Sequence, residues 1–258
     1  MIRLIESNFQ EILAFCERDS FGTRIAASIT AYSTLGSFAR FYVQEHDGEL
    51  SAAISCIDGN ITLCINFENA DCAELLYYIR AFGCKTLICD AEFFKKTGTI
   101  PSHTGAVVSF TDSESFSSEL INLKYSQSEN YKSAYSILQI CGFSDLGNYS
   151  DWLADISLRF RRGVSKIYLA EYGETACATA SILFQTDKSA FMGGIGTLPD
   201  YRGRGIAGAM VSGIARDLTQ KGMGVTLFCK EPLLKFYNKI GFKKTGSWAI
   251  MKEDKGNE

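Results

Sequence analysis

The chain has 258 residues, of which 46% are hydrophobic and 21% are charged, a composition typical of a folded protein with a substantial core. This length suffices for two ordinary domains. The formal charge of −3 argues against nucleic-acid binding, which needs a basic protein face. No apolar run reaches the ~18 residues of a membrane-spanning helix. We therefore expect no nucleic-acid partner and no membrane contact.

The nine cysteines are odd in number and include no C-x-x-C pair. Most lie in apolar, strand-like runs such as "TLICD" and "TLFCK", where cysteine acts as a small hydrophobic residue. This pattern predicts neither a metal site nor a disulfide framework, and it favours a reducing compartment. The first residues, "MIRLIESNFQ", lack the apolar core of a signal peptide. We therefore predict a cytoplasmic protein.

The first half begins with two helix-like stretches between residues 7 and 36. A hairpin is predicted over 40–58, around a central Asp-Gly pair. A further strand leads to "DCAELLYYIRAFG", in which Asp71 can cap a helix and Gly83 can end it. The run "KTLICD" then predicts another strand.

The second half repeats this layout. Helix-like stretches over 130–162 precede a predicted hairpin over 166–184, and another strand follows. The next helix has apolar residues at every fourth position from Ile206 to Leu218, and "VTLFC" predicts the strand after it. We therefore predict two homologous α/β domains, residues 1–124 and 125–258. A chance similarity of two α+β segments is the alternative.

The two halves differ just before the helix that follows the third strand. The first half has "ENADC" there, which is acidic and has no glycine, whereas the second has "PDYRGRGIAG" directly behind "AFMGGIGT". A glycine-rich turn that opens a helix offers unpaired backbone N–H groups and the positive end of the helix dipole. Phosphate fits such a site, and neighbouring arginines add charge and bidentate donors.

Two of three interpretations of this loop fail. A P-loop would need lysine and a hydroxyl residue after Gly208, where alanine and methionine stand. Gly203, Gly205 and Gly208 match the G-x-G-x-x-G of dinucleotide folds. However, four residues separate the strand from the first glycine, and too few residues follow Glu231 for the remaining strands.

The third interpretation rests on R-x-x-G-x-A, formed by Arg202, Gly205 and Ala207. Here the sequence resembles the GNAT superfamily of N-acetyltransferases, whose pyrophosphate loop has the form Q/R-x-x-G-x-G/A. The run "LLKFYNKIGF", residues 233–242, is similar to a second signature of that superfamily. The resemblance covers about residues 125–252 and extends by shape over the first half.

The resemblance implies an α/β (α+β) fold of two GNAT-like domains, each a mixed, mostly antiparallel central sheet flanked by helices. Residues 1–124 would be a degenerate domain without the phosphate loop, and residues 125–258 the catalytic N-acetyltransferase domain.

The resemblance also implies acetyl-CoA as the acetyl donor, with no metal. The strand "GGIGT" would bind the pantetheine arm through its backbone, with Ile195 and Thr197 nearest. Tyr237 falls where many members keep a tyrosine that protonates the departing thiolate, and it is the predicted catalytic residue. The loop would wrap the pyrophosphate, largely with N–H groups, through Arg202, Gly203, Arg204, Gly205, Ile206, Ala207 and Gly208.

Spacing alone leaves other roles open. Pro232 can start a helix and Gly241 can end one, and Tyr237 would then lie on an apolar stripe with Leu233, Phe236 and Ile240, as a core residue. The loop arginines could likewise be solvated surface charges. The run "RFRRG" predicts a helix C-terminus, and the two histidines are expected on the surface.

The predicted function is transfer of acetyl from acetyl-CoA to a primary amine of an unidentified acceptor by direct attack. The acceptor would lie near Asp151 and Asp155, which could hold an ammonium, although a solvated helix face explains these acids equally well. Lys230 departs from the asparagine common in GNAT proteins, and "AFMGGIGT" offers no Glu, Asp or His as general base. The alternative is a non-catalytic coenzyme A-binding regulatory protein.

The first half is expected to bind no coenzyme A of its own. Side chains replace the glycines in "ENADC", and Glu68 and Asp71 can satisfy the N–H groups of the helix start themselves. We expect this half to brace the catalytic half, shape the acceptor site or form a homodimer contact.

Overall fold

The computed structural model describes residues 1–111, 124–173 and 175–252, which form a mixed α/β fold. They divide into two compact units: one holds Met1–Val107 and the chain from Thr245 onward, and the other holds Val108–Lys244. The chain passes between the units within β6 (His103–Phe110) and β12 (Phe242–Lys252). The division into residues 1–124 and 125–258 describes two halves of similar layout rather than compact units, and it stays a prediction.

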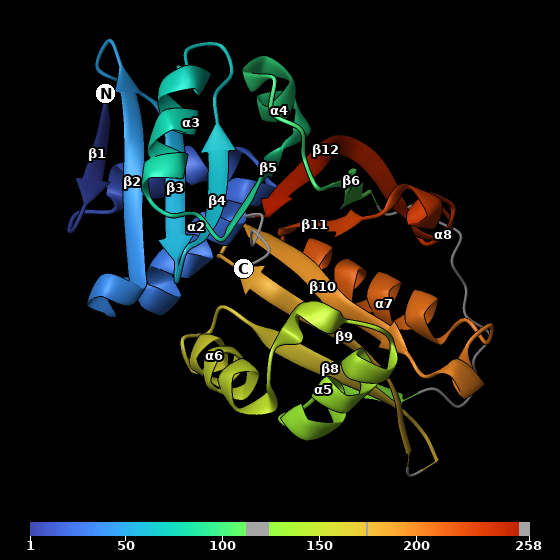
Figure 1. Cartoon of the computed structure of the whole chain (residues 1–258). Helices are drawn as coiled ribbons and strands as arrows, with labels where there is room; N and C mark the ends of the chain where they lie inside the picture. Colours follow the sequence, from blue (N-terminus) through green and yellow to red (C-terminus); the bar gives the residue numbers. More distant parts are fainter. Residues whose placement is uncertain (112–123, 174, 253–258) are drawn as a thin grey trace, which may run out of the picture. The chain divides into compact units, whose positions relative to one another are not determined.

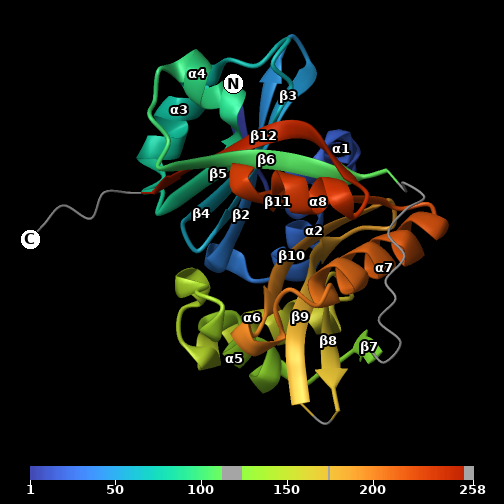
Figure 2. The ribbon, with the colours of Figure 1, turned by 90° about the vertical axis from the view of Figure 1, so that its right-hand side faces the viewer.

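The first unit carries strands in the order β1-β2-β3-β4-β5-β12. Strands β4 and β5 run parallel, and the other neighbouring strands in this order run antiparallel. Helices α1 and α2 cover one face of this sheet and α3 and α4 the other (Figures 1 and 2). The bounds are β1 (Ile2–Ile5), α1 (Gln10–Phe15), α2 (Ser20–Tyr32), β2 (Ala39–His46), β3 (Glu49–Ile57), β4 (Asn60–Ile65), α3 (Cys72–Ala81), β5 (Thr86–Asp90) and α4 (Ala91–Thr97).

The second unit has the order β11-β10-β9-β8-β7, with β10 and β11 parallel and the remaining neighbours antiparallel. Helices α5 and α6 cover one face and α7 the other (Figure 2). The bounds are β7 (Lys124–Gln127), α5 (Tyr131–Ile140), α6 (Tyr149–Arg161), β8 (Lys166–Tyr172), β9 (Thr175–Gln185), β10 (Ser189–Thr197), α7 (Ile206–Gln220), β11 (Gly224–Cys229) and α8 (Leu234–Lys239).

Both halves confirm the predicted order of helices, hairpin, strand, helix and strand. The helix C-terminus predicted at "RFRRG" is also confirmed, because α6 ends at Arg161 and Gly163 follows with a φ of 74°. His46 and His103 are exposed, as expected. Within the described ranges, no helix is long and apolar enough to cross a bilayer.

Helix α7 differs from the other long helices in the residue that caps its start. Five helices begin at a residue whose side chain accepts hydrogen bonds from the first-turn N–H groups, namely Asp19, Asp71, Asp90, Asn130 and Asn148. Helix α7 begins instead at Gly205, which has no side chain to offer. Its first N–H groups therefore lack the side-chain cap that these five helices have.

Candidate functional site

Strand β10 loses its regular pairing where the predicted pantetheine strand begins. Its parallel pairing with β11 runs from Ser189 to Met192 and ends there. On its other side, the register with β9 shifts between Gly193 and Gly196, and Gly194 has a φ of 57°. Such a bulge leaves backbone groups outside the ladder. The backbone of residues 193–197, which includes the predicted Ile195 and Thr197, is therefore available on the side of β11.

The loop between β10 and α7 depends on glycine. Gly203 and Gly205 have φ angles of 75° and 78°, a region that other residues enter at a cost. These two turns bring the chain to the start of α7, where the N–H groups of Ile206, Ala207 and Gly208 have no intrahelical acceptor. The predicted loop residues thus meet at one helix N-terminus, where the positive end of the dipole favours an anion.

Two arginines hold this loop through their own hydrogen bonds. Arg202 Nε donates to the Thr197 carbonyl at 3.0 Å, and Arg204 Nη2 donates to the Asp200 carbonyl at 3.0 Å. The Arg204 guanidinium also lies 5.7 Å from the ring centroid of Tyr172 and 5.4 Å from that of Tyr201. Neither guanidinium is paired with a carboxylate in the part of the chain that the structure describes. Their charge therefore stays available to an anion.

Thr197 carries a buried hydroxyl without a partner. Its Oγ1 has no hydrogen bond, although its carbonyl accepts one from Arg202 and one from Cys141 Sγ at 3.3 Å. A buried hydroxyl that makes no hydrogen bond costs about 1–3 kcal/mol. A ligand group against β10 would remove this cost, and the residues present therefore fit a bound cofactor with polar amide groups.

Tyr237 lies in the core, and its hydroxyl makes no hydrogen bond to another described residue. The residue is 6% exposed, and its ring packs edge-on against Phe236 at 5.0 Å and Phe242 at 5.9 Å. Among the described residues its hydroxyl has no hydrogen-bond partner. Burial, and to a smaller extent the nearby Cys229, raises the pKa of Tyr237 well above its ordinary value, so the hydroxyl stays protonated near neutral pH.

The predicted apolar stripe around Tyr237 is right for one side of the helix only. Tyr237 and Ile240 are buried, but Leu233 and Phe236 are exposed. The helix is also shorter than predicted, because residues 231–233 form a 3-10 turn and α8 begins at Leu234. The core role and the catalytic role of Tyr237 therefore both remain compatible with its position.

The acids proposed to hold an ammonium already have partners. Asp155 forms an ion pair with Arg159 at 2.5 Å, and Asp151 accepts a hydrogen bond from Asn148 Nδ2 at 2.7 Å. Arg159 is itself buried and donates to the Leu183 carbonyl at 3.0 Å. These contacts favour the structural interpretation of both acids. No cluster of three or more possible metal ligands occurs in the ranges that the structure covers.

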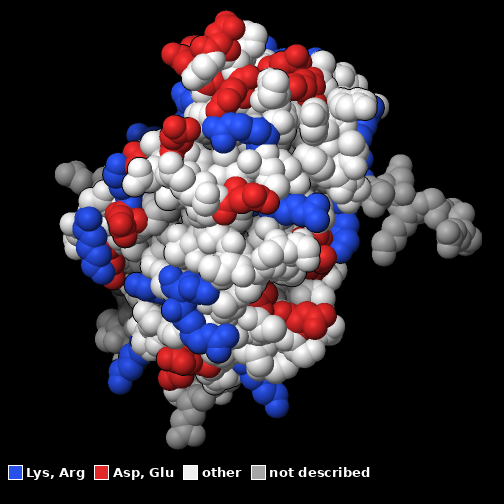
Figure 3. Space-filling model, turned by 90° about the vertical axis from the view of Figure 1, so that its left-hand side faces the viewer, with Lys and Arg blue, Asp and Glu red and all other residues white. Residues whose placement is uncertain are grey.

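The first half has a different arrangement at the corresponding helix start. Asp71 Oδ1 accepts hydrogen bonds from the N–H groups of Ala73 and Glu74 at 3.0 and 2.9 Å, as predicted. The ends of β2 and β4 lie at the same end of their sheet, because both are antiparallel to β3. Figure 3 shows acidic side chains gathered at this end, where Asp47, Glu49 and Glu68 are exposed. An anion would meet occupied donors and like charge there.

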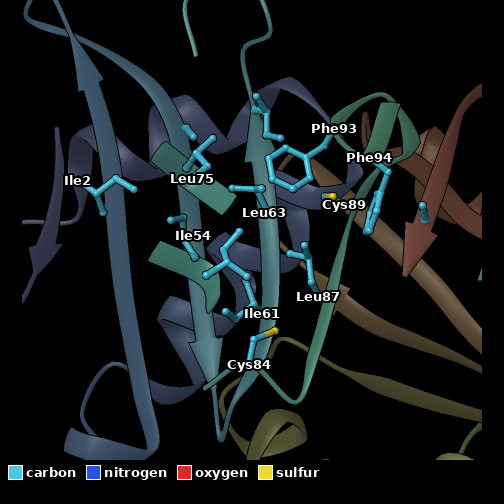
Figure 4. Packing of buried hydrophobic residues seen from close by; sticks show 14 residues of the cluster. Ile2, Ile54, Ile61, Leu63, Leu75, Cys84, Leu87, Cys89, Phe93 and Phe94 are labelled. Carbon is cyan, nitrogen blue, oxygen red and sulfur yellow. The ribbon is translucent and has the colours of Figure 1, made fainter. Parts of the chain in front are cut away.

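The strands of the two halves can be compared residue by residue through "TLICD" and "TLFCK". Asn60 pairs with the threonine of the first run, and Phe191 pairs with the threonine of the second. Counting onward along each strand, Leu63 takes the place of Gly194. Figure 4 shows Leu63 packed beside Phe93 and Cys89 in the first core, where all three are fully buried. A buried leucine therefore stands in the first half where the second half has Gly194.

The same comparison reveals a correspondence that motif reading missed. The run "FFKKTG" at the end of α4 matches "FYNKIG" at the end of α8, and both glycines have positive φ angles, 65° for Gly98 and 96° for Gly241. Phe94 therefore stands where the second half has Tyr237. It is 2% exposed and packs in the core. A comparison of the two halves over this run would have found the pair.

Comparison with known proteins finds similarity to one family. Residues 131–242 match the model of the acetyltransferase (GNAT) family. A solved tandem GNAT protein from the clavulanic acid biosynthesis pathway has a TM-score of 0.63 and 12% identity, over 100% of both chains. A GCN5-related N-acetyltransferase from Sphaerobacter thermophilus has a TM-score of 0.61 and 14% identity, over 97% of this chain and 94% of its own.

An acetyltransferase of the GNAT family from Colwellia psychrerythraea has a TM-score of 0.58 and 10% identity, over 98% of this chain and 100% of its own. No curated protein matches the sequence. The chain therefore has a GNAT-type fold, and residues 131–242 match the acetyltransferase (GNAT) family. Proteins of this family are acetyltransferases that use acetyl-CoA as the acyl donor. The resemblance stated from "LPDYRGRGIAGAM" is thereby confirmed.

Proposed function

We propose that the chain is a cytoplasmic N-acetyltransferase that moves acetyl from acetyl-CoA to a primary amine by direct attack. The observation that carries this proposal is the start of α7, where two positive-φ glycines lead into a helix with no capping side chain. The match of residues 131–242 to the GNAT acetyltransferase family supports this chemistry. The proposed donor, acetyl-CoA, carries its acetyl group as a thioester.

The proposed binding residues follow from the order of elements along the second unit. The backbone of 193–197, with Ile195 and Thr197, would bind the pantetheine arm, and Thr197 Oγ1 would gain the partner it lacks. The loop from Arg202 to Gly208 would bind the pyrophosphate with N–H groups and two guanidinium charges. Backbone N–H groups of β10 would stabilise negative charge that develops on the acetyl oxygen.

Tyr237 is the proposed general acid. A tyrosine hydroxyl carries its proton at neutral pH, and among the described residues the Tyr237 hydroxyl has no hydrogen-bond partner, so the proton is free to be donated. The protein has a second buried aromatic residue at the matching place in the first half, Phe94, which has no proton to donate. The difference between the two halves supports a role for the hydroxyl beyond packing.

A screen of amines for thiol release tests the proposal. Polyamines, amino acids, aminoglycosides and peptide N-termini would each be incubated with the full chain and acetyl-CoA, and free thiol would be measured. Amine-dependent release at a rate above hydrolysis is the expected result. Tight coenzyme A binding without turnover on any amine would instead support the regulatory protein.

A further inference from the structure

We propose a second ligand site on the first unit, in the groove between α3 and α4, for a small organic carboxylate with an aromatic or branched apolar body. The groove has a volume of about 560 Å³, which lies within the range of small-molecule sites. It is lined by Ala73, Leu76, Tyr77, Arg80 and Ala81 from α3 and by Lys96 and Thr97 from α4.

The charged side chains that line this groove are all positive. Its two charged lining residues, Arg80 and Lys96, are both cations, in the last turns of α3 and α4. Within the described chain, neither is paired with a carboxylate. Lys95, the residue before Lys96, is paired with Glu92 at 3.2 Å and does not line the groove. Two unpaired cations that line one groove favour an anionic ligand.

The rest of the lining is apolar and includes an exposed aromatic ring. Tyr77 is 72% exposed, an unusual position for so large a side chain, and it lies beside the half-buried Leu76. Lys96 Nζ lies 5.9 Å from the ring centroid of Phe67, which keeps its ammonium close to apolar surface. A ligand that combines a carboxylate with an apolar body would satisfy both the cations and the ring.

This groove is separate from the proposed acetyl-CoA site in its residues and in its chemistry. None of its lining residues belongs to β10 or to the 202–208 loop. Ala73 of the groove lies in the first turn of α3, but its N–H group already donates to Asp71 Oδ1, so the proposed site does not use that helix start. Helix α4 supplies Phe93 and Phe94 to the core of the first unit, so a ligand that joins α3 to α4 should stabilise that unit.

The test uses 4-phenylbutyrate as the probe. Two control compounds accompany it: the neutral 4-phenylbutyramide keeps the apolar body without the charge, and acetate keeps the carboxylate without the apolar body. Binding to the full chain is followed by saturation-transfer NMR and by titration. Three proteins are compared: wild type, the double variant Arg80→Gln/Lys96→Gln, and the control Lys95→Gln, which removes a lysine from the same turn of α4.

We expect saturable binding of 4-phenylbutyrate to wild type and to Lys95→Gln with equal affinity. The double variant should bind it about tenfold more weakly, while unfolding at the same temperature as wild type. The amide and acetate should bind at least tenfold more weakly than the probe, and coenzyme A should not displace it. Equal binding to the double variant, displacement by coenzyme A, or no binding to wild type would each overturn the proposal. Binding of an acidic peptide without binding of the probe would overturn it in favour of a protein partner.

Discussion

Replacing Tyr237 by phenylalanine isolates the proposed acid from the packing role of the same residue. The ring contacts with Phe236 and Phe242 would remain, and only the hydroxyl would be lost. The first half already accommodates a phenylalanine at the matching position, Phe94, in a core of the same kind. The substitution should therefore leave the fold intact.

The expected magnitudes separate the two roles clearly. Removing a hydroxyl that has no hydrogen-bond partner should change the free energy of unfolding by less than about 1 kcal/mol. Loss of a general acid should lower turnover by about 10²-fold or more, which is roughly 2.7 kcal/mol of barrier. The affinity for acetyl-CoA should stay nearly unchanged, because the hydroxyl acts on the leaving thiolate.

The assay is thiol release with the best amine found in the screen, together with urea unfolding and calorimetric titration of acetyl-CoA. Phe94→Tyr is the matched control, because it adds a hydroxyl at the equivalent place in the half without the loop. Its turnover should equal that of wild type. If Tyr237→Phe keeps turnover within a factor of about two, Tyr237 is a core residue and the reasoning above is refuted.

A further prediction follows from a buried polar group. Thr197→Val removes the unpaired hydroxyl, so the free protein should be about 1 kcal/mol more stable to unfolding, while its affinity for coenzyme A should fall several-fold. Urea unfolding and calorimetric titration measure the two effects, and unchanged affinity would remove Thr197 from the site.

Local patterns were enough to predict the elements of each half. The Asp47-Gly48 turn fixes the β2–β3 hairpin, and Asp71 and Gly83 bracket α3 because capping and left-handed backbone act within a few residues. The glycine loop before α7 was recognised for the same reason. These features depend on neighbours in sequence, which the sequence displays directly.

Features that depend on distant residues were not predictable. Asp155 lies one helical turn before Arg159, so this ion pair is compatible with the spacing, but the Leu183 carbonyl that holds the buried Arg159 in place is 24 residues away. The unpaired Thr197 hydroxyl depends on what packs around β10, which no local pattern reports. The exposed side of α8, with Phe236, follows from how one short helix meets its core.

Calorimetric titration with coenzyme A of wild type, Gly205→Glu and Gly222→Glu tests most directly whether the second half holds the cofactor at the start of α7. Gly205 and Gly222 have φ angles of 78° and 80°, so both substitutions strain the backbone alike, but Gly222 lies beyond the far end of the helix. We predict one coenzyme A per chain for wild type and Gly222→Glu and no binding to Gly205→Glu. Two sites per chain, or undiminished binding to Gly205→Glu, would contradict the proposed site.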